Sequence, residues 1–319
     1  MTRCSHVKTE TGSRLHGGFY TLPTTNKVEW ASIGIYASYP KNKITIQKCE
    51  KTTIQPRDPY IEKILHKIQT TLHLENNYCI NTHEKIPRHH GLGSTTQTIM
   101  ALTTGIYALE NNTLPTRNQV YQLARQLKRG YPSSAGIQTF LYGGILATNN
   151  APSHIPIWHT ALPSNWKIIL VLPKLSRGFS EEEEQAISYV DPWRAPERIQ
   201  RMAYQGLIDL MKGVANEDVD LAVSGLKQIQ SATGSYFSKI QGGSYRPDLA
   251  RIVDEAWRDG IFLAQSSWGP TLYTLTTLDR EASDIKTLKL ITKIAGVDAD
   301  IISVTPRNMP ASIECLEQP

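Results

Sequence analysis

The sequence predicts an α+β protein of two domains, and three observations support this prediction. The chain has 319 residues, which is the length of about two average domains. Patterns typical of strands and of amphipathic helices alternate along it. A stretch at residues 149–165, rich in Pro, Ser and Asn, separates the two halves. We therefore expect an N-terminal domain of residues 1–155 and a C-terminal α+β domain of residues 156–319.

In the first half, β-rich segments come before segments with helical spacing of apolar residues. A predicted strand leads directly into a glycine-rich turn at Gly91, and a helix is expected to start at about Ser94. Strands are expected at residues 28–38, 43–48 and 77–86, and helices at residues 61–72, 94–109 and 120–127.

The second half resumes with a buried apolar run at residues 166–172 and continues with three amphipathic patterns. The tight turn at Gly269-Pro270 separates two short strands. We expect an antiparallel sheet backed by helices on one face. Strands are expected at residues 166–172, 261–265, 271–277 and 300–305, and helices at residues 199–211, 219–240, 249–257 and 281–295.

The composition excludes several classes of protein. With 40% hydrophobic and 20% charged residues, the chain is an ordinary globular sequence. No apolar run approaches the roughly 20 residues of a membrane span, and residues 1–10 are too polar for a secretory signal. The four cysteines are widely spaced without a CxxC pair, which predicts free thiols rather than a zinc or redox site. A cytoplasmic protein with no membrane partner is therefore expected.

The net charge of +5 is unevenly distributed along the chain. Residues 1–160 hold 17 Lys and Arg against 8 Asp and Glu, whereas the remainder is acidic. A positive N-terminal half favours an anionic ligand. The basic residues are scattered, with no stripe interleaved with aromatics, so a small phosphorylated substrate is expected and nucleic acid is not.

The strongest local motif is the run Gly91-Leu92-Gly93-Ser94, which continues as Thr95-Thr96-Gln97. Glycines let the backbone approach a ligand closely, and the start of the following helix offers free N–H groups and a positive dipole end. The motif is neither a Walker A loop nor a full GxGxxG fingerprint. An ordinary glycine turn with a serine N-cap is the alternative reading.

This run resembles the second signature of the GHMP superfamily of small-molecule kinases, in which a GLGSS sequence binds ATP phosphates. Its Thr-Thr-Gln continuation resembles one branch, the archaeal β-ribofuranosylaminobenzene 5′-phosphate synthases. Further motifs of that branch have counterparts in the same order along nearly the whole chain. They lie at residues 11–16, 136–144, 177–184, 241–243, 265–273 and 305–308.

The resemblance implies a GHMP-kinase-like two-domain fold, with a βαβ-type N-terminal domain carrying the phosphate loop and a ferredoxin-like C-terminal domain. It also implies the condensation of 4-aminobenzoate with phosphoribosyl pyrophosphate, with release of CO₂ and pyrophosphate, in methanopterin-type pterin biosynthesis. Mg²⁺ or another divalent cation is expected and an organic cofactor is not. A homodimer is compatible with this reading.

The same resemblance implies the roles of individual residues. The phosphate site would comprise Gly91, Leu92, Gly93, Ser94, Thr95, Thr96 and Gln97. The candidates for catalysis are Arg14, His16 and His90. Substrate would also contact Ser13, Arg177, Ser266, Ser267, Trp268, Gly269 and Thr271.

Departures from the branch keep two alternatives open. The aspartate, arginine and aspartate expected by resemblance are replaced by Glu29, Pro132 and Thr148. An ATP-dependent GHMP kinase shares the phosphate loop, and a non-catalytic homologue that binds a phosphorylated metabolite would tolerate the replacements. The acidic run at residues 181–184 is read as helix-capping acids, with Mg²⁺ binding as the alternative.

Overall fold

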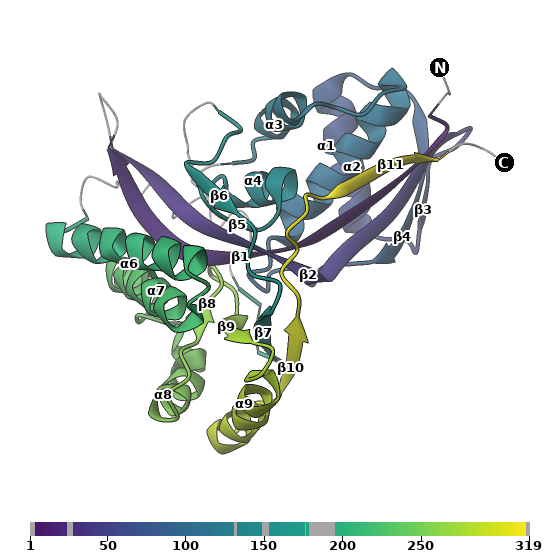
Figure 1. Cartoon of the computed structure of the whole chain (residues 1–319). Coiled ribbons are helices and arrows are strands. Elements are labelled where there is room, and N and C mark those ends of the chain that lie inside the picture. Colours follow the sequence, from purple (N-terminus) through teal and green to yellow (C-terminus); the bar gives the residue numbers. More distant parts are fainter. Residues whose placement is uncertain are drawn as a thin grey trace.

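The computed structural model describes residues 4–23, 28–130, 133–148, 153–175, 177–178 and 195–316. Within these residues the chain forms two sheets, one of seven strands and one of four, with helices packed against both (Figure 1). The α+β class predicted from the sequence is confirmed.

A long antiparallel pair, β1 (His6–Pro23) and β2 (Val28–Cys49), forms the centre of the first sheet and crosses the whole width of the molecule in Figure 1. The strands expected at residues 28–38 and 43–48 are parts of the single strand β2. The sheet order is β11-β1-β2-β4-β3, and β5 and β6 extend it from β2. These strands are β3 (Thr53–Gln55), β4 (Asn77–Glu84), β5 (Ile145–Ala147), β6 (Trp158–Thr160) and β11 (Ser312–Leu316).

Four helices accompany the first sheet: α1 (Pro59–Leu72), α2 (Ser94–Asn111), α3 (Arg117–Gln126) and α4 (Ala135–Tyr142). Helix α2 contacts β1, β2 and α4, and most of its side chains are buried on all sides. A helix that is buried on most of its sides carries few charged residues. Its first turn is thereby held rigidly against the sheet.

The second sheet has the order β10-β7-β9-β8, with every pair antiparallel. Its strands are β7 (Trp166–Pro173), β8 (Ala264–Gln265), β9 (Leu272–Thr277) and β10 (Ala299–Val304). The predicted helices are confirmed as α6 (Glu197–Ala215), α7 (Val219–Gln241), α8 (Ala250–Arg258) and α9 (Glu281–Ala295).

Both faces of the second sheet are buried, because alternate residues of β7 point to opposite sides. Ile169 and Val171 pack in one core cluster with α8 and α9. Ile168 and Leu170 belong to a different cluster, which includes α6, α7 and residues of β1 and β2. Helices therefore lie on both faces, and the expectation of helices on one face only is wrong. This second cluster joins the two sheets into one core.

The division of the chain at residue 155 remains a prediction. Strand β6 lies beyond that point but pairs with β5 of the first sheet. The last strand, β11, also returns to the first sheet and pairs with β1. The first sheet is thus assembled from both halves of the sequence.

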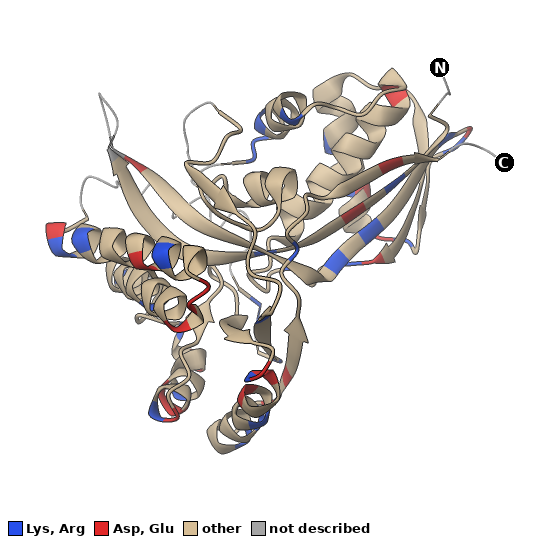
Figure 2. Ribbon diagram, viewed as in Figure 1, with Lys and Arg blue, Asp and Glu red and all other residues tan. Residues whose placement is uncertain are grey.

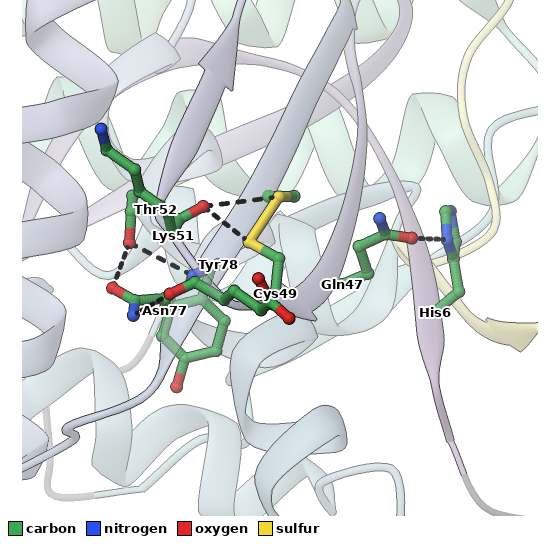
Figure 3. The surroundings of a disulfide bond; sticks show 9 residues. His6, Gln47, Cys49, Lys51, Thr52, Asn77 and Tyr78 are labelled. Carbon is green, nitrogen blue, oxygen red and sulfur yellow. Dashed lines mark hydrogen bonds between the residues drawn. A yellow bond between two sulfur atoms is a disulfide. The ribbon is translucent and has the colours of Figure 1, made fainter.

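The expectation of free thiols is wrong, because the described cysteines form two disulfides. Cys4 is joined to Cys315, and Cys49 to Cys79. The strand pairings explain both bonds: β11 lies beside β1, and β4 lies beside β2, so residues far apart in sequence become neighbours. Figure 3 shows the second disulfide, next to the hydrogen bond in which Thr52 donates to Asn77.

None of the helices in the described parts of the chain is both long enough and apolar enough to cross a membrane.

Candidate functional site

The start of α2 is open to an external ligand. Gly93 is the N-cap residue, in a left-handed conformation with φ of 71°, and no side chain caps the helix. The first N–H groups of α2 therefore lack the usual side-chain acceptor, and the helix dipole adds a partial positive charge at the same point. The sequence motif predicts an anion site at this helix start, and the uncapped N–H groups are compatible with one.

Three glycines from distant segments meet beside this helix start. A Cβ atom on Gly91 would lie 2.0 Å from the carbonyl oxygen of Ser266, and one on Gly269 would lie 2.1 Å from the backbone nitrogen of Gly91. Gly178 packs against the same place and donates from its N–H to the His89 carbonyl at 2.7 Å. Only glycine allows these three backbones to approach so closely.

A pocket of about 520 Å³ opens over the helix start. Two arginines, Arg14 from β1 and Arg129 from the loop after α3, belong to its wall, and none of the described lining residues is acidic. By contrast, charges of both signs are mixed over the outer helices α6, α8 and α9 (Figure 2). The lining consists of Arg14, His89, Gly91, Gly93, Ser94, Thr95, Thr96, Arg129, Gly178, Ser267 and Gly269. We call this the anion pocket.

Strand β1 holds Arg14 at the anion pocket. The backbone N–H of Arg14 donates to the carbonyl of Leu92 at 3.0 Å, which fixes the strand to the glycine loop. A Cβ atom on Gly93 would lie 3.3 Å from Nε of Arg14, so the guanidinium passes directly over the glycine. The residue at the N-cap must therefore be small for the arginine to reach the anion.

Several residues expected at the site are buried or hydrogen-bonded to the protein, and they hold the site together. Ser266 is buried, accepts from the backbone N–H of His16 at 3.0 Å and donates to the Gly91 carbonyl at 2.6 Å. Gln97 donates to the Gly136 carbonyl at 2.7 Å and thereby links α2 to α4. Leu92 lies in the hydrophobic core, Ser13 donates to the Pro40 carbonyl, and Thr271 is buried beside the turn.

The other expected residues lie around the anion pocket. Trp268 and His16 line a second, adjacent pocket, and Ser267 belongs to both. Arg177 is exposed and precedes Gly178. His90 is half-buried, and its pKa is lowered by burial and by the neighbouring His89 and Arg246.

The structure adds lining residues that the sequence did not single out for the site: His89, Arg129 and Gly178. Arg129 follows the helix expected at residues 120–127. It lies three residues before Pro132, which occupies the family's arginine position and falls outside the described residues. Arg129 thus brings an arginine to the pocket from a nearby position. The only signal for it in the sequence was its place shortly before the central glycine-rich segment.

The other departures are structural or lie outside the described residues. Thr148 is fully buried, and its hydroxyl accepts from the Ser32 backbone N–H at 2.9 Å. Glu29 is partly buried on β2, opposite Leu22 of β1. Residues 181–184 fall outside the described chain. Within the part that is described, no group of three or more His, Cys, Asp or Glu side chains is placed to hold a metal ion.

Comparisons with known proteins agree with this architecture. Residues 59–144 match the family model "GHMP kinases N terminal domain". The chain is 26% identical over 241 residues to beta-ribofuranosylphenol 5'-phosphate synthase of Methanothermobacter thermautotrophicus, covering 69% of this chain and 71% of that protein. It is 24% identical over 302 residues to the Methanocaldococcus jannaschii protein of the same name, covering 83% and 88%.

Solved structures show the same fold over nearly the whole chain. Homoserine kinase from Cytophaga hutchinsonii superimposes with a TM-score of 0.68 at 16% identity, covering 97% of this chain and 98% of that one. Mevalonate diphosphate decarboxylase from Staphylococcus aureus gives a TM-score of 0.64 at 13% identity, with the same coverage. Residues 59–144 thus resemble the N-terminal domain of GHMP kinases, nearly the whole chain has the fold of these kinases, and the chain, like its curated relatives, is an enzyme.

Proposed function

We propose that this enzyme condenses phosphoribosyl pyrophosphate with a benzoate carrying a 4-amino or 4-hydroxyl group, and releases CO₂ and pyrophosphate. The observation that carries the proposal is the anion pocket, in which the open start of α2 meets Arg14 and Arg129 without a described acidic neighbour. A diphosphate leaving group needs a site of this kind. The names of the curated relatives supply the ribosyl chemistry.

Electrostatic stabilisation of the departing pyrophosphate is the main task of the pocket. As the bond between the anomeric carbon and the pyrophosphate oxygen breaks, negative charge grows on the leaving group. N–H groups at the helix start and the two arginines that line the pocket would stabilise this charge with little reorganisation. Charge-assisted hydrogen bonds of this type contribute about 1.5–3 kcal/mol each.

The remaining bond changes balance without an external acid or oxidant. The ring carbon that bears the carboxylate forms a bond to the anomeric carbon. The bond from that ring carbon to the carboxylate then breaks, CO₂ leaves, and the electron pair restores the aromatic ring. Holding the two substrates side by side supplies much of the rate.

We also propose that a divalent cation enters with the diphosphate. The described side-chain oxygens of the anion pocket are the hydroxyls of Ser94, Thr95, Thr96 and Ser267, so most ligands of the ion would be phosphate oxygens and water. When bound, the ion would neutralise part of the pyrophosphate charge.

Two aromatic acids are candidates for the acceptor of the ribosyl group. The branch that the motifs resemble is named for an aminobenzene product, whereas the curated relatives are named for a ribofuranosylphenol. The first name corresponds to 4-aminobenzoate and the second to 4-hydroxybenzoate. Both acids are therefore tested.

An ATP-dependent kinase is the alternative, because the chain is also 23% identical over 225 residues to homoserine kinase of Aquifex aeolicus. The deciding experiment incubates the enzyme with phosphoribosyl pyrophosphate, Mg²⁺ and each carboxyl-labelled acid, and in parallel with ATP and small alcohols. Labelled CO₂ that requires both the acid and phosphoribosyl pyrophosphate is the expected result. ADP formation without CO₂ would replace the proposal with the kinase.

A further inference from the structure

A second pocket lies directly beside the anion pocket and shares Ser267 with it. It lies between strand β1, helix α7 and the turn after β8, and its space of about 350 Å³ is partly open to solvent. Its lining residues are His16, Gly18, Phe19, Gln230, Thr233, Gly234, Phe237, Gln241, Gln265, Ser267 and Trp268. We call this the ring pocket.

Three aromatic side chains of the ring pocket suit a flat ligand. The ring of Phe237 lies 5.6 Å from that of Phe19 and 5.4 Å from that of Trp268, centroid to centroid, and the latter pair is edge-to-face. Aromatic rings in such an array offer both faces and edges to a further ring. The ring pocket therefore has aromatic walls and lies directly beside the anion pocket.

Most polar side chains of the ring pocket are already paired with protein groups. The Thr233 hydroxyl accepts from the backbone N–H of Phe19 at 2.7 Å and donates to the Ile229 carbonyl at 2.9 Å. The Gln265 amide donates to the Ser267 carbonyl at 2.9 Å, and its oxygen accepts from the Arg246 backbone N–H at 2.9 Å. These groups shape the pocket.

His16 is different, because one of its ring nitrogens is buried without a partner. The side chain is 3% exposed, and Nδ1 accepts from the backbone N–H of Gly18 at 3.1 Å. In the neutral ring the proton then resides on Nε2, which has no hydrogen-bond partner within the described chain. His16 thus presents one unused donor. Burial together with Arg14 lowers the pKa of His16 well below its usual value, so the ring stays neutral.

Gln230 presents the complementary group. It lies on α7, is 5% exposed, and its Oε1 finds no hydrogen-bond partner among the described residues. Leaving a buried acceptor unpaired is unfavourable, so a ligand that donates to it gains affinity. The ring pocket therefore combines aromatic walls with one unused donor and one unused acceptor.

We propose that the ring pocket binds the aromatic acid acceptor, with its carboxylate accepting from His16 Nε2–H and its 4-substituent donating to Gln230 Oε1. The assignment of the two ends follows from hydrogen-bond chemistry. A carboxylate only accepts, so it requires the donor, whereas a 4-hydroxyl or 4-amino group donates. The identity of the ring ligand as an aromatic acid rests on the proposed function.

The geometry of β1 would place the carboxylate end of the acceptor beside the anion pocket. Arg14 and His16 are two residues apart in a regular part of β1, paired with Tyr36 and Gly34 of β2. Their side chains therefore leave the same face of the strand, one toward each pocket. The carboxylate-bearing carbon held by His16 would then lie on the side of the pyrophosphate held by Arg14. His16 acts here as a substrate-binding residue, and Gln230 selects the 4-substituent.

The test compares the binding of 4-hydroxybenzoate, benzoate and methyl 4-hydroxybenzoate by calorimetry, without phosphoribosyl pyrophosphate. The parent enzyme is expected to bind 4-hydroxybenzoate about tenfold more tightly than either analogue, because benzoate lacks the 4-hydroxyl donor and the methyl ester replaces the charged carboxylate by a weaker, neutral acceptor. Gln230→Met should erase the difference between 4-hydroxybenzoate and benzoate and leave benzoate affinity unchanged. Gln228→Met is the matched control, since Gln228 is two residues away on α7 and bonds Asp209 instead.

The inference is overturned by equal binding of the three compounds by the parent, or by an undiminished preference for 4-hydroxybenzoate in a folded Gln230→Met variant. Absence of measurable binding in the parent overturns it as well. The comparison of ligands in the parent decides the matter even if the variant does not fold. The proposed reaction is judged separately, by labelled CO₂ release, so either idea can fail while the other stands.

Discussion

The two pockets hold their ligands by opposite means. The anion pocket is made mostly of backbone: glycines that let chain segments meet, a helix start, and two arginines at the rim. The ring pocket is made of side chains, with aromatic walls and two buried polar atoms. The contrast teaches that a charged diphosphate is positioned by rigid main-chain geometry, whereas selectivity for the acceptor depends on the identities of individual side chains.

The largest effect is expected from Gly93→Asp, which should affect the anion pocket alone. A carboxylate at the N-cap would occupy the anion site and repel the diphosphate, so affinity for phosphoribosyl pyrophosphate should fall by about a thousandfold. Asparagine has nearly the same size and also tolerates the left-handed conformation, so Gly93→Asn is the control: it crowds Arg14 as aspartate does, and the additional loss in Gly93→Asp measures the effect of the charge. Calorimetry with phosphoribosyl pyrophosphate and with 4-hydroxybenzoate checks both pockets. Similar losses in the two variants would show that steric crowding, not charge, is responsible.

Removing one disulfide tests whether ligand binding in the two pockets depends on the part of the first sheet where β2 pairs with β4. Replacing Cys49 and Cys79 by alanine reopens a loop with a sequence separation of 30 residues. The free energy of unfolding, measured by urea denaturation, should fall by about 3 kcal/mol. Affinity for phosphoribosyl pyrophosphate and for 4-hydroxybenzoate should stay the same, because neither cysteine lines the anion pocket or the ring pocket. A loss of binding in the folded variant would contradict the independence of the two regions.

A smaller and more local effect is expected from Arg129→Gln. Removing one charge-assisted contact should weaken phosphoribosyl pyrophosphate binding by about 10- to 100-fold and reduce its salt dependence. Lys128→Gln removes the same charge from the adjacent exposed residue and should have almost no effect. If both variants weakened binding equally, the role of Arg129 would be only its contribution to net charge.

The smallest effect concerns pH. The pKa of His16 is lowered in the folded protein. Below about pH 6.5, His16 therefore binds a proton in the unfolded chain but not in the folded chain. Stability should therefore fall as pH decreases through that region, by at most about 1.4 kcal/mol per pH unit for this group. His90 and His159 also have lowered pKa values and add to the slope. In His16→Gln the slope of unfolding free energy between about pH 7 and pH 5 should be shallower; an unchanged slope would mean that His16 is protonated when folded.

The sequence predicted the features that depend on local pattern. Helix α9 occupies residues 281–295, as its spacing of apolar residues indicated, and the anion pocket forms at the glycine motif. Helix α4 was not predicted, because residues 136–144 entered the sequence analysis only as the counterpart of a motif of the resembling branch. Gly136 instead lies inside the helix beside Thr96, where a larger residue would be crowded.

Features that depend on distant pairings could not be predicted. The disulfides follow from the positions of β11 and β4 in the sheet, and no spacing of cysteines encodes these positions. The ring pocket combines β1, α7 and the turn after β8, which meet only in the folded chain. A role for Gln230 could not be predicted from the sequence, because a single glutamine on an amphipathic helix is usually a surface residue.

The pairing of β1 with β11 has a consequence for how the chain is made. Residues His6–Glu10 of β1 find their partners at Ser312–Leu316, so the outer edge of β1 stays unpaired until almost all of the described chain has left the ribosome. An exposed strand edge is a template for pairing with other chains, and contacts between residues so distant form slowly. Newly synthesised molecules therefore pass through a period in which this edge is open to association with a neighbouring nascent chain, and the arrival of the last strand ends it.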